Sequence, residues 1–451
     1  MKANNRNNGD FISVSEATDS ILPVSWNSAL LRDTLLHRKG KKPKRLEDAK
    51  WDGSVPYIDI EAFETGRIRK YADPDSSVII EEGDVIIVWD GARCGLVGKA
   101  PARGALGSTL MALTSTSLRE GYLLRFLQLL YEIINTNPRG TGIPHVDPEI
   151  FWNLEMPIAP EEEQKRIVAK IDELLPKVNA VRERLIRVKE IMRRFRQSVL
   201  AAACSGRLSE DWRDSQVLVN EKKCNENHGV RSGAENDEPS LLPASWTRAT
   251  INQVCNEIVD CPHSTPKWAK DGEICVRTTN FRPGFLDLSE VRYVSKETYK
   301  KRTERLDPMP GDVLYSREGG ILGIACRIPE GPKICLGQRM MLMRTDKIRF
   351  KSAFLMHALN SPQTQQIVIE LTGGSASPHL NVKEIKQFPV PVPPPIEQVE
   401  IVRRVESLFK LADKIEKRVE VELSRTEKMT QAILAKAFRG ELVASEAELG
   451  R

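Results

Sequence analysis

The longest regular pattern of apolar positions runs from about residue 161 to residue 204. Apolar side chains recur at alternating intervals of four and three, starting with Ile167, Ile171, Leu174, Val178, Val181 and Leu185 and continuing to Val199. A strict 4,3 alternation over more than four heptads predicts a coiled-coil helix, roughly 65 Å long at 1.5 Å per residue. Pro176 lies inside this pattern, and we expect it to kink or restart the helix.

A second stretch close to the C-terminus repeats this pattern. Its apolar positions are Ile401, Val405, Leu408, Ala412, Ile415 and Val419, after which Glu422 and Thr426 are polar. A helix this long cannot bury its seam against a single small domain, so the two helices should pack on each other. The polar segment 209–241 is long enough to return the chain, which predicts an antiparallel pair with pseudo-twofold symmetry.

The segments that precede the two long helices have a different pattern. Short apolar runs such as Val85-Ile86-Ile87-Val88-Trp89 and Ile274-Cys275-Val276 alternate with Gly, Pro and Asn, which is typical of short strands with intervening helices. Each segment ends in an apolar string that contains proline, Met156–Pro160 and Phe388–Pro395. Because proline cannot donate to a strand ladder, these strings should form edge strands.

The chain is an internal duplication. Leu22-Pro23-Val24-Ser25-Trp26 returns as Leu242-Pro243-Ala244-Ser245-Trp246, and Gly83-Asp84-Val85 returns as Gly311-Asp312-Val313. Pro144-His145, Glu163-Gln164 and Gly206 return at an offset of 234 as Pro378-His379, Glu397-Gln398 and Gly440. The fold class that follows is α+β, with two tandem α/β domains joined by two long helices. The expected divisions are a tail (1–21), a first domain (22–160), a central helix (161–208), a polar linker (209–241), a second domain (242–395), a C-terminal helix (396–442) and a tail (443–451).

Composition narrows the class of protein. The 451 residues contain 67 Lys+Arg and 62 Asp+Glu, 40% hydrophobic residues and eight cysteines without a C-x-x-C pair. These values are ordinary for a globular protein with reduced thiols, which predicts a cytoplasmic location. No apolar run approaches the length of a membrane span. Nucleotide-binding, hydrolase, metalloprotease and methyltransferase motifs are absent from the sequence, so we expect a reader or scaffold with no catalytic residues.

A basic run after the first opening motif is a candidate DNA contact. It includes Arg38, Lys39, Lys41, Lys42, Lys44 and Arg45, interrupted by Gly40 and Pro43. Such a loop can lie along phosphates, although a solvated surface run is the alternative. Arg93 and Arg317 follow the two Gly-Asp motifs, and Arg339 follows Gly337; we add them as further candidates.

The corresponding zone of the second copy holds side chains that can read base edges. Lys267, Arg277, Thr278 and Asn280 are the candidates, because Arg and Asn recognise guanine and adenine in the major groove. When the copies are aligned on Gly66 and Gly284, Asp59 takes the place of Arg277. This exchange fits two copies that read different bases, and equally fits surface drift. Cys255, Cys261 and His263 are a weak alternative as zinc ligands, because their spacing is unusual.

Two glycine-bracketed loops are shared by the copies. They contain Arg139, Thr141 and His145 in the first copy and Ser375, Ser377 and His379 in the second. Their backbone amides could hold a phosphate, but we favour a structural role for the two histidines. Arg182, Arg184, Arg187 and four further basic residues on the first long helix are expected to be solvated flanks that also contact a protein partner.

These repeated motifs, taken together, resemble the specificity (S) subunit of type I restriction–modification enzymes. The resemblance covers about 22–208 and 242–442. It implies two target-recognition domains that each read one half of a bipartite DNA sequence, and a helical pair that sets the spacer. It also implies two methyltransferase (M) subunits docked on the helices and motor–nuclease (R) subunits that join them. S-adenosylmethionine, ATP and Mg²⁺ would then belong to the partners, with no cofactor or metal on this chain.

Two other classes of protein are the alternatives to a DNA reader. A pure assembly scaffold would show no sequence-selective DNA retention. A stand-alone DNA-modifying enzyme would transfer methyl groups or cleave DNA by itself. The divergent front domains disfavour the scaffold, and the missing motifs disfavour the enzyme.

Overall fold

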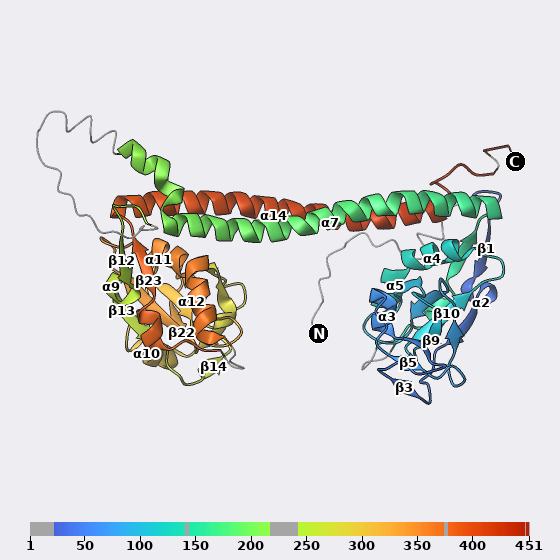
Figure 1. Cartoon of the computed structure of the whole chain (residues 1–451), viewed down its shortest axis with the longest axis horizontal. Helices are drawn as coiled ribbons and strands as arrows, with labels where there is room; N and C mark the ends of the chain where they lie inside the picture. Colours follow the sequence, from blue (N-terminus) through green and yellow to red (C-terminus); the bar gives the residue numbers. More distant parts are fainter. Residues whose placement is uncertain (1–21, 140–143, 217–241, 374–377, 447, 451) are drawn as a thin grey trace, which may run out of the picture. The chain divides into compact units, whose positions relative to one another are not determined.

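The computed structural model describes residues 22–139, 144–216, 242–373, 378–446 and 448–450. The chain divides into two compact units, Met1–Ile186 with Glu420–Arg451 (unit 1) and Arg187–Val419 (unit 2). Each unit therefore combines one front domain with parts of both long helices, α7 (Glu161–Ser205) and α14 (Pro395–Phe438). The expected α+β class, with two domains and two long helices, is confirmed (Figure 1). No described helix is both long and apolar enough to cross a membrane.

Unit 1 contains three sheets. A two-stranded antiparallel sheet pairs β1 (Asn27–Leu30) with β11 (Glu155–Ile158). A four-stranded sheet has the order β2 (Leu36–Lys39), β10 (Leu110–Thr114), β7 (Val85–Val88) and β8 (Val97–Lys99), and a five-stranded sheet has the order β3 (Leu46–Glu47), β5 (Tyr71–Ala72), β4 (Val55–Ile58), β9 (Gly104–Leu106) and β6 (Ile79–Ile80). The helices of its front domain are α2 (Leu31–Thr34), α3 (Ile60–Thr65), α4 (Glu120–Leu129), α5 (Tyr131–Thr136) and α6 (Pro148–Trp152).

Unit 2 also contains three sheets, but with different numbers of strands. The two-stranded sheet pairs β12 (Thr247–Thr250) with β23 (Pro389–Val392). A six-stranded sheet has the order β13 (Cys255–Asp260), β22 (Met340–Thr345), β19 (Val313–Ser316), β20 (Ala325–Arg327), β17 (Gly284–Leu286) and β16 (Phe281–Arg282), and a four-stranded sheet has the order β14 (Trp268–Ala269), β18 (Arg292–Val294), β15 (Glu273–Val276) and β21 (Ile334–Leu336). Its helices are η1 (Arg207–Ser209), α9 (Ile251–Val254), η2 (Thr278–Asn280), α10 (Lys296–Thr303), α11 (Ser352–Leu359), α12 (Pro362–Thr372) and α13 (Val382–Lys386). In Figure 1, α11 lies next to the long helices.

The two long helices pack antiparallel inside each unit. In unit 1, Ile167 near the start of α7 shares a buried cluster with Leu434 and Phe438 near the end of α14. Arg166 also donates to Glu446, in the segment that follows α14, at 2.6 Å. In unit 2, Arg196 near the end of α7 donates to Asp413 at 2.7 Å and to Glu416 at 2.8 Å. The predicted antiparallel packing of the two helices is therefore present in both units.

Most predicted seam residues are buried, but Val181 is not. Ile167, Ile171, Val178, Ile401, Val405 and Val419 are buried, whereas Leu174, Leu185, Leu408 and Ile415 are half-buried. The side chain of Val181 is 45% exposed and lines a groove between α7 and α14 in unit 1, opposite Glu422 and Thr426. The seam prediction was wrong at Val181 because the polar residues of α14 leave the groove unfilled there.

The expected restart of the first helix at Pro176 was also wrong, because α7 continues unbroken through this residue. Proline removes one backbone donor, which leaves the carbonyl of Asp172 four residues earlier without its usual partner. Pro176 lies on the exposed side of the helix, where water can bind such a carbonyl. Residues 210–216, which the sequence placed in the polar linker, are also helical.

The repeated sequence motifs fix each front domain to its long helices. The indole Nε1 of Trp26 donates to the buried Glu163 at 2.9 Å, and Trp246 donates to Glu397 at 2.9 Å. Next to these glutamates, Gln164 accepts a hydrogen bond from the backbone N–H of Arg119 and Gln398 accepts one from Lys351. The Leu-Pro-x-Ser-Trp and Glu-Gln motifs are therefore two halves of one buried joint.

The Gly-Asp motifs close an equivalent turn in each domain. Asp84 accepts a hydrogen bond from the backbone N–H of Glu81, and Asp312 accepts one from Met309. Each aspartate also pairs with an arginine of the same sheet, Arg38 at 3.2 Å and Arg344 at 2.7 Å. Arg38, a predicted DNA contact, therefore has a partner inside its own domain.

A buried histidine makes the stability of unit 2 sensitive to acid. His357 on α11 is 3% exposed, its Nε2 has no hydrogen-bond partner among the described residues, and its ring meets Phe409 edge to face. Burial, with a smaller effect of Arg327, lowers the pKa of His357 to about 4. Since an unfolded histidine titrates near pH 6.5, the unfolded chain binds the proton first as the pH falls.

We therefore expect His357 to add no pH dependence to the free energy of unfolding of unit 2 above pH 6.5. Between pH 6.5 and pH 4 it should fall by up to about 3 kcal/mol. His357→Leu should remove this part of the loss, as measured by urea unfolding at pH 7 and pH 4.5. His263→Leu, at an exposed histidine, is the control. An equal acid loss in His357→Leu would contradict the assignment.

Candidate nucleic-acid interface

A polar cluster lies where strands β2 and β7 of unit 1 end. Lys39, the last residue of β2, pairs with Asp90 at 2.6 Å, and His145 Nδ1 contacts the other oxygen of Asp90 at 2.7 Å. Asp90 and His145 also form a β-bridge, and the Lys39 ammonium lies 5.8 Å from the centre of the Trp89 ring. The lysine, the carboxylate and the partly exposed imidazole together offer donors and an acceptor at one place.

The equivalent place in unit 2 carries a different arrangement of charge. Strand pairing makes the positions correspond, because Lys39 lies opposite Met111 and Asp260 lies opposite Met341 in the matching strands. Asp260 forms a two-pronged pair with the buried Arg317, at 2.8 and 3.1 Å. The first strand thus carries a cation, Lys39, in unit 1 and an acid, Asp260, in unit 2. Both glycine loops keep an acid, Asp90 and Glu318, and the cation of unit 2 comes from Arg317, at the position of Trp89.

The surrounding residues of the second cluster repeat the first. Glu318 and His379 form a β-bridge, as Asp90 and His145 do. The exposed His263 lies 3.2 Å from Asp260, and Arg317 also pairs with Glu318 at 2.6 Å. The structure therefore brings the two Pro-His loops to the polar clusters, which sequence reasoning did not foresee.

The basic loop of unit 1 extends directly from Lys39. A Cβ atom on Gly40 would lie 2.0 Å from the carbonyl oxygen of Gly107, so only glycine allows this close approach. Lys41, Lys42 and Lys44 are exposed, and their ammonium groups make no ion pair with the described residues. Arg45 instead pairs with Glu47 at 2.7 Å and stacks on Trp51 at 4.2 Å. Within this loop, the three lysines are therefore available for phosphates.

We expect the triple variant Lys41→Gln, Lys42→Gln, Lys44→Gln to bind DNA with a weaker salt dependence. Three lost phosphate contacts lower the slope of log K against log salt by up to about 2.7, at about 0.9 per contact. Fluorescence anisotropy of a labelled duplex between 50 and 200 mM salt measures this slope. The matched control replaces Lys165, Lys170 and Lys177, which pair with acids on α7, and should leave the slope unchanged. Equal slopes in the two triple variants would argue against the lysine loop.

The predicted readers Asp59 and Arg277 occupy corresponding positions. Each comes directly after a strand that pairs in parallel with another strand: Ile58 lies opposite Leu106 in unit 1, and Val276 lies opposite Leu336 in unit 2. Asp59 caps α3 by accepting from the backbone N–H of Ala62 at 2.9 Å. The guanidinium Nε of Arg277 is buried and has no hydrogen-bond partner among the described residues. Asp59 therefore has a structural role as a helix cap, whereas the Nε of Arg277 makes no hydrogen bond to the described residues.

Asn280 is committed to its own loop. Its side-chain oxygen accepts from the N–H of Arg277 at 2.9 Å, and its amide donates to the carbonyls of Asp287 and Glu290 at 3.0 and 2.8 Å. The side chain is 4% exposed, so a role in reading bases would require these bonds to break. Our expectation that Asn280 faces a base edge is not supported by this geometry.

The remaining candidates lie as follows. Lys267, Arg139 and Arg339 are exposed, Thr278 is half-buried, and Arg93 pairs with Glu64 at 2.5 Å. Arg339 has a left-handed backbone (φ 67°), which is unusual for a residue with a Cβ, and its carbonyl accepts from the N–H of Arg317 at 3.0 Å. Thr141, Ser375 and Ser377 lie outside the described residues.

Arg302 is the residue that sequence reasoning missed. It is buried on α10 and donates to four carbonyl oxygens, those of Leu336 and Gly337 at 2.7 and 2.8 Å and those of Ser264 and Pro262 at 3.1 and 3.3 Å. These bonds tie the loop after β13 to the loop before Arg339. The only sequence signal was a basic helix, Lys296–Thr303, in which nothing distinguishes Arg302 from its neighbours.

The geometry does not favour a zinc site. Cys261 is buried, accepts from the N–H of Met340 at 3.4 Å, and has its pKa raised by burial. Burial raises the pKa of Cys255 to about 12. In the part of the chain that the structure describes, no group of three or more His, Cys, Asp or Glu residues is arranged to hold a metal ion.

The fold and the clusters define a class of protein, namely a duplicated two-domain chain with long helices and a different polar cluster on each domain. The sequence model for the type I restriction modification DNA specificity domain matches residues 23–190 and again residues 246–425. The chain belongs to this family, as the repeated motifs suggested.

Several known proteins are similar over most of the chain. The specificity subunit of the type I restriction enzyme EcoBI from Escherichia coli is 33% identical over 69% of this chain and 63% of that protein. The EcoKI specificity subunit from Escherichia coli (strain K12) is 28% identical over 94% of this chain and 89% of that protein. A chain from structural work on complex assembly and conformational transition of the type I R-M system has a TM-score of 0.67 at 20% identity, covering 93% of this chain and 99% of that chain. This last similarity shows a shared fold.

Proposed function

We propose that this chain is the DNA specificity subunit of a type I restriction–modification complex, in which each front domain reads one half of a bipartite target. The observation that carries the proposal is the change of charge at one matched strand position, where unit 1 has Lys39, paired with Asp90, and unit 2 has Asp260, paired with Arg317. Two readers of different bases need the same frame with different donors and acceptors. Family membership supports the same role.

The long helices have the features of a docking platform for protein partners. Their exposed apolar side chains include Val181, Ile186, Met429 and Val421 in unit 1 and Ile191, Ile396, Val399 and Leu411 in unit 2. Exposed apolar side chains gathered on one element mark interaction surfaces. The proposed partners are two methyltransferase subunits, joined by motor–nuclease subunits. The helices also act as the ruler that sets the spacer between the half-sites.

Catalysis in this scheme belongs to the partners. S-adenosylmethionine, ATP and Mg²⁺ would be bound by the methyltransferase and motor–nuclease subunits, and this chain would supply recognition and assembly. The complex would act in the cytoplasm, where chromosomal and invading DNA meet it.

The test of this proposal is a domain exchange. Replacing 246–395 by the matching domain of a relative should alter one half-site and leave the other half-site and the spacer unchanged, as read by sequencing methylated DNA. The incoming segment carries tryptophan at position 246, and Glu397 lies outside the exchange, so that the new domain still docks. A change in both half-sites would show that the domains are not independent readers. Absence of sequence-selective retention of DNA by the assembled complex would favour the scaffold.

A further inference from the structure

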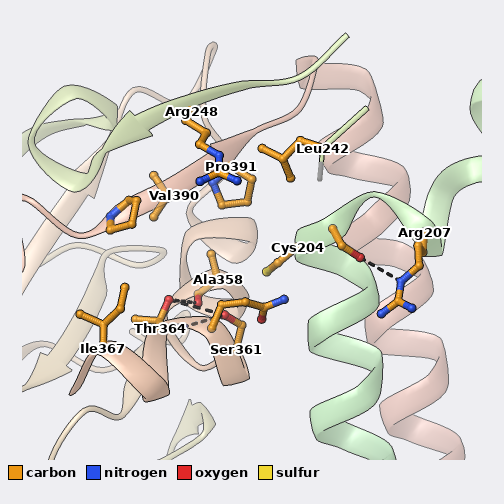
Figure 2. A pocket seen from close by; sticks show the side chains of 13 residues that line it. Cys204, Arg207, Leu242, Arg248, Ala358, Ser361, Thr364, Ile367, Val390 and Pro391 are labelled. Carbon is orange, nitrogen blue, oxygen red and sulfur yellow. Dashed lines mark hydrogen bonds between the residues drawn. The ribbon is translucent and has the colours of Figure 1, made fainter. Parts of the chain in front are cut away.

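Unit 2 contains a pocket of about 500 Å³ beside the end of α7. Its lining comes from three directions: Cys204 on α7, Ala358 and Thr364 on α11 and α12, and Val390 with Pro391 on β23. In Figure 2 the sulfur of Cys204 points into this space, and Arg248 of β12 lies beside Pro391. The volume lies within the range of small-molecule sites.

The same place in unit 1 is filled by two aromatic rings. Phe438 on α14 corresponds to Cys204, because Gly440 and Gly206 beyond them pack on Pro23 and Pro243 in the same way. Phe126 corresponds to Ala358, because Arg119 and Lys351 begin their helices with the same hydrogen bond to Gln164 and Gln398. The rings of Phe126 and Phe438 meet edge to face at 5.2 Å. Unit 2 therefore keeps the frame and lacks both rings.

The charge around the pocket is also reversed. Strand pairing makes Ser28 correspond to Arg248 and Glu155 correspond to Pro389. In unit 1 the hydroxyl of Ser28 donates to Glu155, and Arg439 pairs with Glu441 at 2.9 Å. At the matching positions unit 2 has no acid: Arg207 replaces Glu441, and Arg248 replaces Ser28.

Neither arginine is neutralised by a described acid. Arg207 and Arg248 both line the pocket and are exposed. The Nε of Arg207 donates to the hydroxyl of Ser205 at 3.2 Å, and Arg248 forms no ion pair with the described residues. Burial raises the pKa of the Cys204 thiol to about 12, so this side chain is neutral and does not repel an anion.

We propose that this pocket binds a small planar aromatic ligand that carries an anionic group. The ring would take the place that Phe126 and Phe438 fill in unit 1, against the apolar lining. The anion would pair with Arg248 at the edge of the pocket, with Arg207 adding to the positive field, because guanidinium groups bind carboxylates, phosphates and sulfonates through paired donors. The bound ligand would join the end of α7 to β12 and β23, and so stabilise unit 2.

A matched pair of dyes tests this proposal on the full chain. 1-Anilinonaphthalene-8-sulfonate has the required rings and anion, and N-phenyl-1-naphthylamine has the same rings without the anion. We expect saturable 1:1 binding of the sulfonate, seen as increased fluorescence. The surface variant Arg207→Glu/Arg248→Glu should raise the Kd of the sulfonate at least tenfold and change that of the neutral dye less than twofold.

A second variant tests the position of the rings. Cys204→Phe/Ala358→Phe restores the aromatic pair of unit 1 and should abolish binding of both dyes, with circular dichroism melting to confirm that the variant is folded. If the double variant does not fold, Cys204→Phe alone should raise the Kd of both dyes at least tenfold. Met429→Glu, in the apolar groove of unit 1, is the control and should leave sulfonate binding unchanged. The proposal is overturned if the sulfonate does not bind saturably, if Cys204→Phe leaves its Kd unchanged, or if Met429→Glu abolishes binding.

Discussion

Deleting residues 179–185 from α7 together with residues 422–428 from α14 should shorten the spacer of the recognised DNA by about three base pairs. Seven residues of helix span about 10.5 Å, at 1.5 Å per residue, and each base pair spans about 3.4 Å. Removing a whole heptad from both helices keeps the 4,3 pattern in register. Both segments line the same groove of unit 1, so their seam positions are matched.

The readout is sequencing of methylated DNA from cells that carry the shortened chain with its partners. Both half-sites should be unchanged, because the deletions leave the front domains intact. The control removes seven residues, 225–231, from the polar segment that lies outside the described residues, and should leave the spacer as it is. A spacer that is unchanged after the paired heptad deletion, in a complex that still methylates, would refute the ruler role.

Arg302→Leu should abolish reading of the half-site assigned to unit 2 while the half-site of unit 1 is still read. The substitution removes donors from four carbonyl oxygens and frees the loops that hold Ser264 and Gly337. Charge-assisted hydrogen bonds each contribute about 1.5–3 kcal/mol, so the loss is large compared with the stability of one domain. We expect specific DNA retention to fall at least a hundredfold.

Lys301→Leu on the same helix is the matched control, because Lys301 is exposed and its ammonium group makes no ion pair with the described residues. Retention of duplexes that carry one intact half-site and one scrambled half-site separates the two domains. Binding to the duplex with only the unit 1 half-site should be equal in the wild type and in Arg302→Leu. If Arg302→Leu weakened both single half-site duplexes equally, Arg302 would not be a positioning residue of one domain.

Features that depend on regular spacing could be predicted from the sequence. The 4,3 pattern predicted two long helices, and Ile167, Ile171, Ile401 and Val405 are buried as expected. The pattern failed at Val181 because burial there depends on what the other helix presents, namely Glu422 and Thr426. The effect of Pro176 was overestimated for a related reason, since a proline on the exposed side of a helix leaves its unpaired carbonyl open to water.

Residues whose role depends on long-range contacts could not be predicted. Arg302 meets carbonyls more than thirty residues away in either direction, and Asn280 bonds within a turn that only the fold defines. Judged by residue type alone, Asn280 was a better candidate for base contact than Arg302 was for a structural role, because asparagine often recognises adenine. The change from Lys39 to Asp260 at one strand position became visible only once strand register had aligned the two domains.

Selection of the DNA sequence for its partners is the function that we propose for this chain. Single-molecule sequencing of adenine methylation in the source genome, with and without this gene, tests this function. We expect one split motif, two fixed half-sites with a constant spacer, that loses its methylation when the gene is deleted and regains it on complementation. A methylated split motif that persists unchanged after deletion, in cells that express the methyltransferase partner, would contradict it.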